Sequence, residues 1–239
     1  MGLFSDVLHV WQRDRDQVLP ALSDALAAAK YSVTTMPVSP PHPDADGDDL
    51  LFFVAPQAGN WTVILQAHAY RRDAPHLSDL AGILSAKLGT YALSLNVHDD
   101  DILFYNLYRA GEALDGYNSS PQYFEQEPLS EEQIRSQHHD SFALAPLLPE
   151  GTTLDQLQAI LDKGWWAAHD AGRLDESGLA PDDEAAFAGE EERMVALANL
   201  LQLHGAPIGY PYAAWYHSPK INWTALIALK AQPRAGAAR

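Results

Sequence analysis

The sequence predicts an α+β protein, in which an antiparallel, meander-rich sheet has helices packed against it and is followed by a mostly helical C-terminal part. Three observations support this prediction. Segments with alternating apolar residues, typical of strands, lie mainly in the first half of the chain. Helical periodicity interrupts them twice and dominates after residue 130. The 239 residues are 47% hydrophobic, which is sufficient for a substantial core.

The first part of the chain alternates between predicted strands and helices. Residues 7–11 predict a short strand, and Asp14 or Asp16 is suited to cap the helix that follows, to about residue 30. A second helix, expected at 76–88, ends at Gly89, a residue type favoured directly after a helix. Further strands are expected at 31–38, 50–56 and 61–69.

Residues 90–118 predict two consecutive hairpins. Residues 90–98 show the clearest alternation in the chain, and the acidic segment His98–Asp101 predicts a tight turn into a strand at 102–109. Ala110 and Gly111 predict the next turn, into a shorter strand at 112–118. Because residues 102–108 are largely apolar on both faces, we expect this tyrosine-rich strand to lie mostly in the core.

Helical signals dominate the second half. Ser130 with Gln133, and Thr153 with Gln156, fit the capping box that begins many helices. A further helix is expected at about 190–204, and the tail at 231–239 is expected to be frayed. We therefore expect a sheet domain at 1–126 and a mainly helical region at 127–239, which can also pack on the first as one unit.

Composition excludes several classes of function. Cysteine is absent, which excludes disulfides, thiol catalysis, zinc–thiolate sites and iron–sulfur clusters. The formal net charge of −17 disfavours nucleic acid as a partner, and fits either solubility alone or long-range attraction to a basic protein. Neither a long apolar run nor a secretion signal at the start of the chain is found, so no membrane segment and a cytoplasmic location are expected.

His138, His139 and Asp140 form the most suggestive group of metal-binding residue types, because imidazole and carboxylate bind zinc when cysteine is absent. Adjacent residues on a helix, however, point about 100° apart, and no zinc-binding spacing such as H-E-x-x-H is found. We therefore expect a polar helix end, where histidines suit the C-terminal dipole, and predict no metal site.

Three other polar segments have both a functional and a structural interpretation. The segment His98–Asp101 could bind a cation or supply acid–base groups, but is typical of a turn. The acidic loop at 39–49 lacks the spacing of an EF-hand, so a solvated connection is favoured over calcium binding. The segment 68–76 could bind a carboxylate or phosphate, although a solvated loop is favoured; its charged residues are Arg71, Arg72 and Asp73.

Motifs of familiar catalytic sites are absent. The chain contains no G-x-S-x-G, no phosphate-binding loop and no dinucleotide fingerprint, so we assign no catalytic residue and no cofactor. Large aromatic residues of the second half are typical of interfaces or of helices packed on a sheet, and core packing is favoured. They are Trp165, Trp166, Tyr210, Tyr212, Trp215 and Tyr216.

Two stretches resemble a family of uncharacterised bacterial proteins. Residues 84–124, LSAKLGTYALSLNVHDDDILFYNLYRAGEALDGYNSSPQYF, are similar to a pattern of strand, acidic turn, strand ending L-Y-x-x-G, and D-x-[YF]-[ND]-S-x-P-x-Y-[FW]. Residues 197–216, LANLLQLHGAPIGYPYAAWY, are similar to a later segment of the same proteins, but depart from it at His204 and Ala206. The resemblance implies a bacterial, cytoplasmic, autonomous domain and carries over no catalytic residue.

We expect a non-enzymatic, acidic cytosolic protein that binds another protein, itself basic, in the manner of an immunity-type or adaptor-like protein. The alternative is a His/Asp-dependent hydrolase, and a third interpretation is a structural or oligomer-forming module. The hydrolase interpretation requires histidines to converge with acids in one pocket, and its candidates are His68, His76, His98, His138 and His139.

Overall fold

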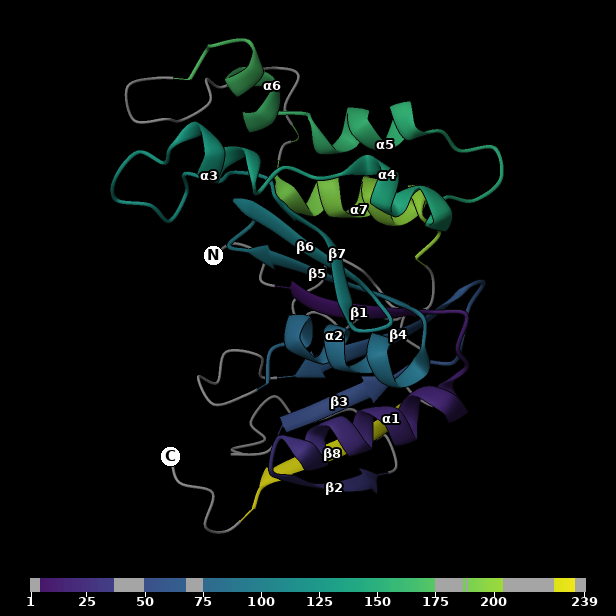
Figure 1. Ribbon diagram of the computed structural model, residues 1–239. Helices are drawn as coiled ribbons and strands as arrows, with labels where there is room; N and C mark the ends of the chain where they lie inside the picture. The colour runs from purple at the N-terminus through teal and green to yellow at the C-terminus, as the bar shows by residue number, and fades with distance from the viewer. Residues whose placement is uncertain are drawn as a thin grey trace.

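The computed structural model describes residues 5–36, 50–67, 75–174, 187, 189–203 and 226–234. Within these residues the strands form one eight-stranded antiparallel sheet with helices on both faces (Figure 1), which confirms the predicted α+β class. The strand order is β2-β8-β3-β4-β1-β5-β6-β7. The predicted segments 39–49, 68–74 and 210–216 lie outside the described residues.

The strands are β1 (Ser5–Trp11), β2 (Tyr31–Met36), β3 (Leu50–Val54), β4 (Trp61–Ala67), β5 (Tyr91–His98), β6 (Ile102–Arg109), β7 (Glu112–Asn118) and β8 (Ile227–Pro233). The helices are α1 (Arg15–Ala28), α2 (Leu77–Leu88), α3 (Glu131–Arg135), α4 (Ser141–Leu144), α5 (Leu154–Leu161), α6 (Trp165–Asp170) and α7 (Glu190–Leu200), and a 3-10 turn, η1 (Ala145–Leu147), follows α4. Among the described helices, none combines the length and hydrophobicity that crossing a membrane requires.

Several helix starts lie where the local sequence signals predict them, whereas α7 ends at Leu200 and not near residue 204 as expected. Asp14, rather than Asp16, caps α1, and its side chain accepts the backbone N–H of Gln17 at 2.9 Å. Complete capping boxes at Ser130 and Thr153 begin α3 and α5. These side chains satisfy N–H groups that have no partner within a helix, which explains why the helices begin there.

The expectation of a frayed tail is wrong for residues 231–233. They belong to β8, which lies between β2 and β3, so that Leu229 is opposite Thr35 on one side and Phe52 on the other. Hydrogen bonds to β2 and β3 satisfy the backbone N–H and C=O groups of β8, although the sequence of β8 shows little of the alternation typical of a strand. The sheet therefore includes a strand from the end of the chain, and the ranges 1–126 and 127–239 share it.

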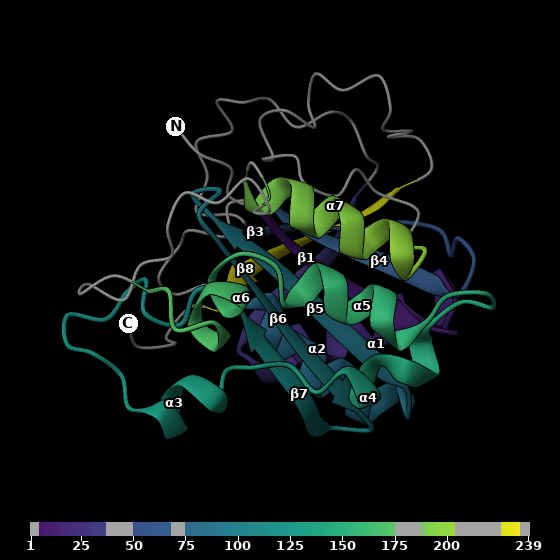
Figure 2. The same cartoon turned by 90° about the horizontal axis from the view of Figure 1, so that it is seen from above.

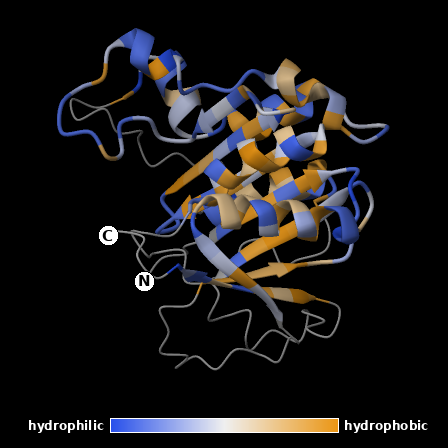
Figure 3. Cartoon of the chain, turned by 60° about the horizontal axis from the view of Figure 1, so that its bottom comes forward, coloured by the Kyte–Doolittle hydropathy of each residue, from blue (hydrophilic) through white to orange (hydrophobic). Residues whose placement is uncertain are grey.

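Two hydrophobic clusters lie on opposite faces of the sheet. On one face, α1 and α2 bury residues such as Leu22, Leu26, Leu80 and Leu84 against the strands. Helices from the second half, α7 and α5 among them, cover the other face, as Figure 2 shows from above. Figure 3 shows the strands mostly in the hydrophobic colours and many of the turns and the outer helical segments in hydrophilic ones.

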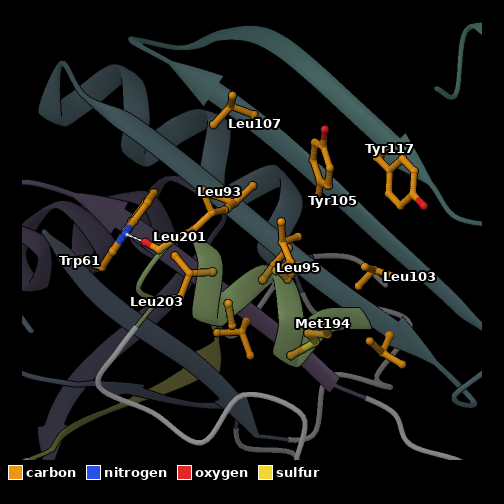
Figure 4. Packing of buried hydrophobic residues seen from close by; sticks show 14 of the residues in the cluster. Trp61, Leu93, Leu95, Leu103, Tyr105, Leu107, Tyr117, Met194, Leu201 and Leu203 are labelled. Carbon is orange, nitrogen blue, oxygen red and sulfur yellow. Dashed lines mark hydrogen bonds between the residues drawn. The ribbon is translucent and has the colours of Figure 1, made fainter. Parts of the chain in front are cut away.

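The tyrosine-rich strand β6 lies between β5 and β7, and four of its eight residues are buried and three are half-buried, in agreement with a strand mostly in the core. Tyr105 and Leu107 are 1% and 0% exposed, whereas Phe104 on the opposite face is only half-buried. Figure 4 shows Tyr105 beside Tyr117 of β7, with ring centroids 5.4 Å apart. In the same cluster the indole Nε1 of Trp61 donates to the carbonyl of Leu201 at 3.0 Å, which ties β4 to the end of α7.

Candidate functional site

His138 and His139 lie in the link between α3 and α4. The α3 helix ends at Arg135, and the backbone N–H of His138 donates to the carbonyl of Arg135 at 3.2 Å. The two histidines thus follow the helix end and are not themselves helical. Outside a helix, consecutive side chains need not point about 100° apart, so both imidazoles can approach one group.

That group is Asp162, the C-cap residue of α5. Its Oδ1 lies 2.9 Å from Nε2 of His138 and 2.7 Å from Nε2 of His139. We call His138, His139 and Asp162 the His–Asp centre. Asp140, the sequence neighbour of the histidines, does not join it, because its carboxylate caps α4 and accepts the backbone N–H of Phe142 at 3.0 Å.

Aromatic rings hold the two imidazoles in place. The ring of His138 lies 4.3 Å from the rings of both His139 and Trp166, and His139 lies 5.9 Å from Tyr117. The side chain of His139 is 2% exposed, that of His138 is 24% exposed, and that of Asp162 is 42% exposed. The His–Asp centre is therefore fixed on its inner side and open to solvent at the carboxylate.

Strand β7 positions both halves of the centre. Asn118 binds Gln137, the residue before His138, through its backbone N–H at 3.0 Å and its side-chain amide at 2.6 Å. The carbonyl of Asn118 also accepts the indole N–H of Trp166 at 2.9 Å. Tyr117 donates its hydroxyl to the carbonyl of Leu161, the residue before Asp162, at 2.6 Å. One buried strand end thus sets the distance between the histidines and the aspartate.

The electrostatics of the centre favour an ionised carboxylate. Partial burial opposes ionisation of Asp162, but hydrogen bonds from His138 and His139 outweigh it and hold the pKa of this carboxyl well below its usual range. Since an ionised carboxylate only accepts, each imidazole donates from Nε2. The other ring nitrogen of His139, Nδ1, is buried and has no hydrogen-bond partner.

The predicted acidic turn after β5 is confirmed as a turn. Asp99 and Asp100 have φ of 53° and 62°, and the N–H of Asp101 donates to the carbonyl of His98 at 3.1 Å, within the three-residue loop that joins the paired residues His98 and Ile102. Asp100 Oδ1 accepts the N–H of Glu191 at 2.7 Å, at the start of α7. The Asp100 carboxylate thus joins the hairpin to the start of α7, in agreement with the structural interpretation of the segment.

The remaining predicted candidates do not join the His–Asp centre. His76 is the exposed N-cap residue of α2, and His98 packs against Phe124 with ring centroids 5.1 Å apart. His68 lies outside the described residues. Trp165 and Trp166 are 6% and 0% exposed, which confirms core packing for this pair.

A second histidine with acidic neighbours was missed by the sequence reasoning. His169 of α6 lies 3.2 Å from both Glu131 and Asp170, and Arg135 binds the same two acids. Glu131 of α3 is 38 residues from His169 of α6, and no sequence motif relates residues at that separation. Asp162 was missed for the same reason, since only the packing of α5 on β7 brings it to the histidines.

An exposed aromatic surface lies toward the N-terminal end of β6, away from Arg109 at its C-terminal end. Phe124 is 55% exposed and Tyr123 is 37% exposed. The ring of Phe124 nevertheless stacks on Phe104 at 6.3 Å and meets His98 and Tyr123 edge-on. We call His98, Phe104, Tyr123 and Phe124 the Phe124 surface. The Tyr123 hydroxyl donates to Asp101 at 2.6 Å, which fixes the second ring as well.

The surroundings of the Phe124 surface are acidic. Residues 123–128 are all exposed and include Glu125 and Glu127. Across residues 110–134 the sequence contains acidic residues and no lysine, arginine or histidine. The hydrogen bond to Asp101 contributes most to raising the pKa of the Tyr123 phenol to about 12, and desolvation and the charges of Asp101 and Asp99 raise it further. An apolar ring is therefore presented within a field of negative charge.

Comparisons with known proteins do not assign either site. No protein-family model, no curated protein and no solved structure matches this chain. The resemblance to uncharacterised bacterial proteins therefore stays a prediction.

Proposed function

We propose that this chain is a non-enzymatic protein that binds a basic segment of another protein through the Phe124 surface. The observation that carries the proposal is the 55% exposure of Phe124, a large apolar side chain whose ring is held by Phe104 and His98. An aromatic residue that is exposed but already ordered loses little entropy on binding, which is typical of an anchor residue.

The charge of the chain defines the chemistry of the partner. The formal net charge is −17, and the segments that carry the Phe124 surface include the acids of residues 99–101 and Glu125 and Glu127. This field attracts a segment rich in arginine and lysine over several ångströms and raises the rate of encounter. A guanidinium can also stack on the exposed face of Phe124 or Tyr123. Binding without chemistry is the mode of an immunity-type or adaptor-like protein.

A bacterial lysate passed over the immobilised chain tests the proposal, with Phe124→Ala and Phe142→Ala as parallel baits. Phe142 is a matched control, because it is also an exposed phenylalanine (72%) but lies on α4. We expect a basic partner that the Phe142→Ala bait retains and the Phe124→Ala bait loses, with an affinity loss of about 2 kcal/mol, close to 30-fold.

Salt provides the second readout. Raising the ionic strength from about 0.05 M to 0.5 M shortens the Debye length several-fold and should release the partner from the wild-type bait. A partner that is not basic, that ignores salt, or that binds the Phe124→Ala bait with full affinity contradicts the proposal.

The hydrolase alternative is a second candidate, favoured by the His–Asp centre. His138 is the more exposed imidazole and is hydrogen-bonded to an aspartate, the arrangement of a general base with an orienting acid. Neither imidazole of the centre hydrogen-bonds a serine or threonine hydroxyl among the described residues, so water would be the nucleophile. A panel of chromogenic ester and phosphodiester substrates tests this, with loss of turnover in Asp162→Asn as the expected result. Turnover that survives this substitution contradicts it.

A further inference from the structure

We infer that the His–Asp centre binds one divalent transition-metal ion, of which zinc is the best fit, through Nε2 of His138, Nε2 of His139 and a carboxylate oxygen of Asp162. This inference is independent of protein binding by the Phe124 surface. It also stands whether or not the centre has hydrolytic activity.

The donor atoms already converge. One ligand atom from each of the three residues lies within 4.8 Å of the other two. Zinc ligands at about 2.0–2.2 Å from the ion are about 3.4 Å apart in tetrahedral geometry. The present Nε2–Oδ1 separations of 2.9 and 2.7 Å therefore need to widen by about half an ångström. Rotation of the half-exposed Asp162 side chain widens these separations, and each imidazole binds the ion as the tautomer that carries its proton on Nδ1, since a ligating Nε2 carries none.

Hydrogen bonds fix the backbone segments that carry the three donor residues, as a preorganised metal site requires. The three carbonyls beside Asp162, from residues 160, 161 and 163, all accept hydrogen bonds from the buried guanidinium of Arg193. Tyr117 donates to residue 161 as well, and Asn118 holds Gln137 before the histidines. A site whose ligand-bearing segments are fixed by neighbouring hydrogen bonds loses little entropy when the ion binds.

The cations near the centre are engaged elsewhere. Lys163, the neighbour of Asp162, places its ammonium 4.2 Å from the ring centre of Phe187. The Arg193 side chain directs its hydrogen bonds to Glu190, Tyr117 and backbone carbonyls. A divalent ion would therefore meet a carboxylate that no lysine or arginine neutralises among the described residues, and whose partners are two imidazoles.

The ligand types select the kind of ion. Two imidazoles and one carboxylate suit zinc, cobalt, nickel and ferrous iron, whereas calcium and magnesium prefer oxygen donors alone. Asp162 is 42% exposed, which leaves a path for entry and room for a water as fourth ligand. The buried Nδ1 of His139 has no acceptor, although metal-binding histidines usually donate from this nitrogen. We therefore expect weaker binding than in a structural zinc site with four protein ligands.

Cobalt(II) is the probe of choice, because its visible absorption bands report tetrahedral nitrogen and oxygen ligands. We expect one equivalent of Co²⁺ to produce these bands in the full chain and Zn²⁺ to abolish them. His138→Gln and Asp162→Asn replace partly exposed side chains and each should weaken Co²⁺ binding at least tenfold. His139 is left unchanged, because its burial would mix folding with binding.

His169→Gln is the matched control, since His169 lies on the same side of the sheet and also contacts two acids. It should bind Co²⁺ as the wild type does. Circular dichroism checks that each variant retains its secondary structure. Absence of the bands in the wild type, their survival in Asp162→Asn, or their loss in His169→Gln would each overturn the inference. A partner captured by the Phe124 surface has no bearing on this result.

Discussion

The guanidinium of Arg193 and the hydroxyl of Tyr117 donate to the same carbonyl oxygen, that of Leu161, at 3.0 and 2.6 Å. Arg193 is 2% exposed and its Nε also donates to Glu190 at 2.7 Å. Its remaining donors reach the carbonyls of residues 160 and 163. One side chain of α7 thus caps the C-terminal end of α5 and joins both helices to β7.

Arg193→Met should lower the free energy of unfolding by about 3–5 kcal/mol, because it leaves Glu190 buried without its cation and several carbonyls without donors. Arg135→Met is the matched control, since Arg135 makes two ion pairs in an exposed position (49% side-chain exposure). We expect that control to lose less than about 1 kcal/mol. Urea unfolding measures both, and equal losses would contradict the structural role assigned to Arg193.

His9 should make the fold sensitive to acid. The residue lies on β1, is 0% exposed, and neither ring nitrogen makes a hydrogen bond of good geometry, although the backbone of Leu93 lies nearby. Burial lowers the pKa of His9 from 6.5 to about 3, and the backbone of Leu93 opposes this only in part. The unfolded chain therefore takes up a proton between these two values that the folded chain does not, and stability falls as the pH falls through this window.

His9→Leu removes that proton uptake. The stability of the variant relative to wild type should therefore be greater at pH 4 than at pH 7.5, measured by urea unfolding at both values. A difference between variant and wild type that is the same at both pH values would show that His9 does not titrate as described.

Asp6 should make the fold less stable as the pH rises, which is opposite to the effect of His9. This half-buried residue of β1 accepts a hydrogen bond from the backbone N–H of Leu77, at the start of α2. Burial, which this hydrogen bond offsets in part, raises the pKa of Asp6 from 3.8 to about 7. Between these values the folded protein holds a proton that the unfolded chain releases, so stability falls as the pH rises through the window.

Asp6→Asn removes this contribution while retaining the size and an accepting oxygen. The variant should gain stability relative to wild type as the pH is raised from 5 to 8, measured by thermal unfolding at both values. A gain that appears on acidification instead would contradict the raised pKa of Asp6.

Gly189 should not tolerate a side chain. A Cβ at this position would collide with the carboxylate of Asp100, which accepts the N–H of Glu191 at the start of α7. Gly189→Ala should therefore lower stability by about 1–3 kcal/mol by displacing Asp100. Gly116→Ala is the control, because a Cβ there meets only ordinary contacts at 3.6 and 3.8 Å. Comparable losses in the two variants would show that the Asp100 contact is not the cause.

Elements whose signals are local were predictable from the sequence. The capping boxes at Ser130 and Thr153, the left-handed Gly89 after α2 and the turn at Asp99 and Asp100 all lie where expected. The alternation in residues 90–98 correctly separates the side chains that face the α7 cluster from those on the α2 side. These signals act within a few residues, so they do not depend on the rest of the fold.

Both candidate sites depend on contacts between distant segments. His138 and His139 were identified as metal-binding residue types, but their helix was expected to separate them, and Asp162 is 24 residues from His138. Phe124 was recognised only as part of an aromatic stretch, because its exposure depends on how residues 119–125 lie against β5 and β6.

The sequence by itself determined the class of the fold, the two hairpins, the capped starts of α1, α3 and α5 and the acidic character of the chain, because these follow from periodicity, turn and capping residues and composition. Only the tertiary structure decided that β8 enters the sheet between β2 and β3, and that β7 brings Asp162 to the two histidines. The physical reason is that backbone pairing and side-chain packing join groups tens to hundreds of residues apart, and no local pattern encodes which of the available partners they meet.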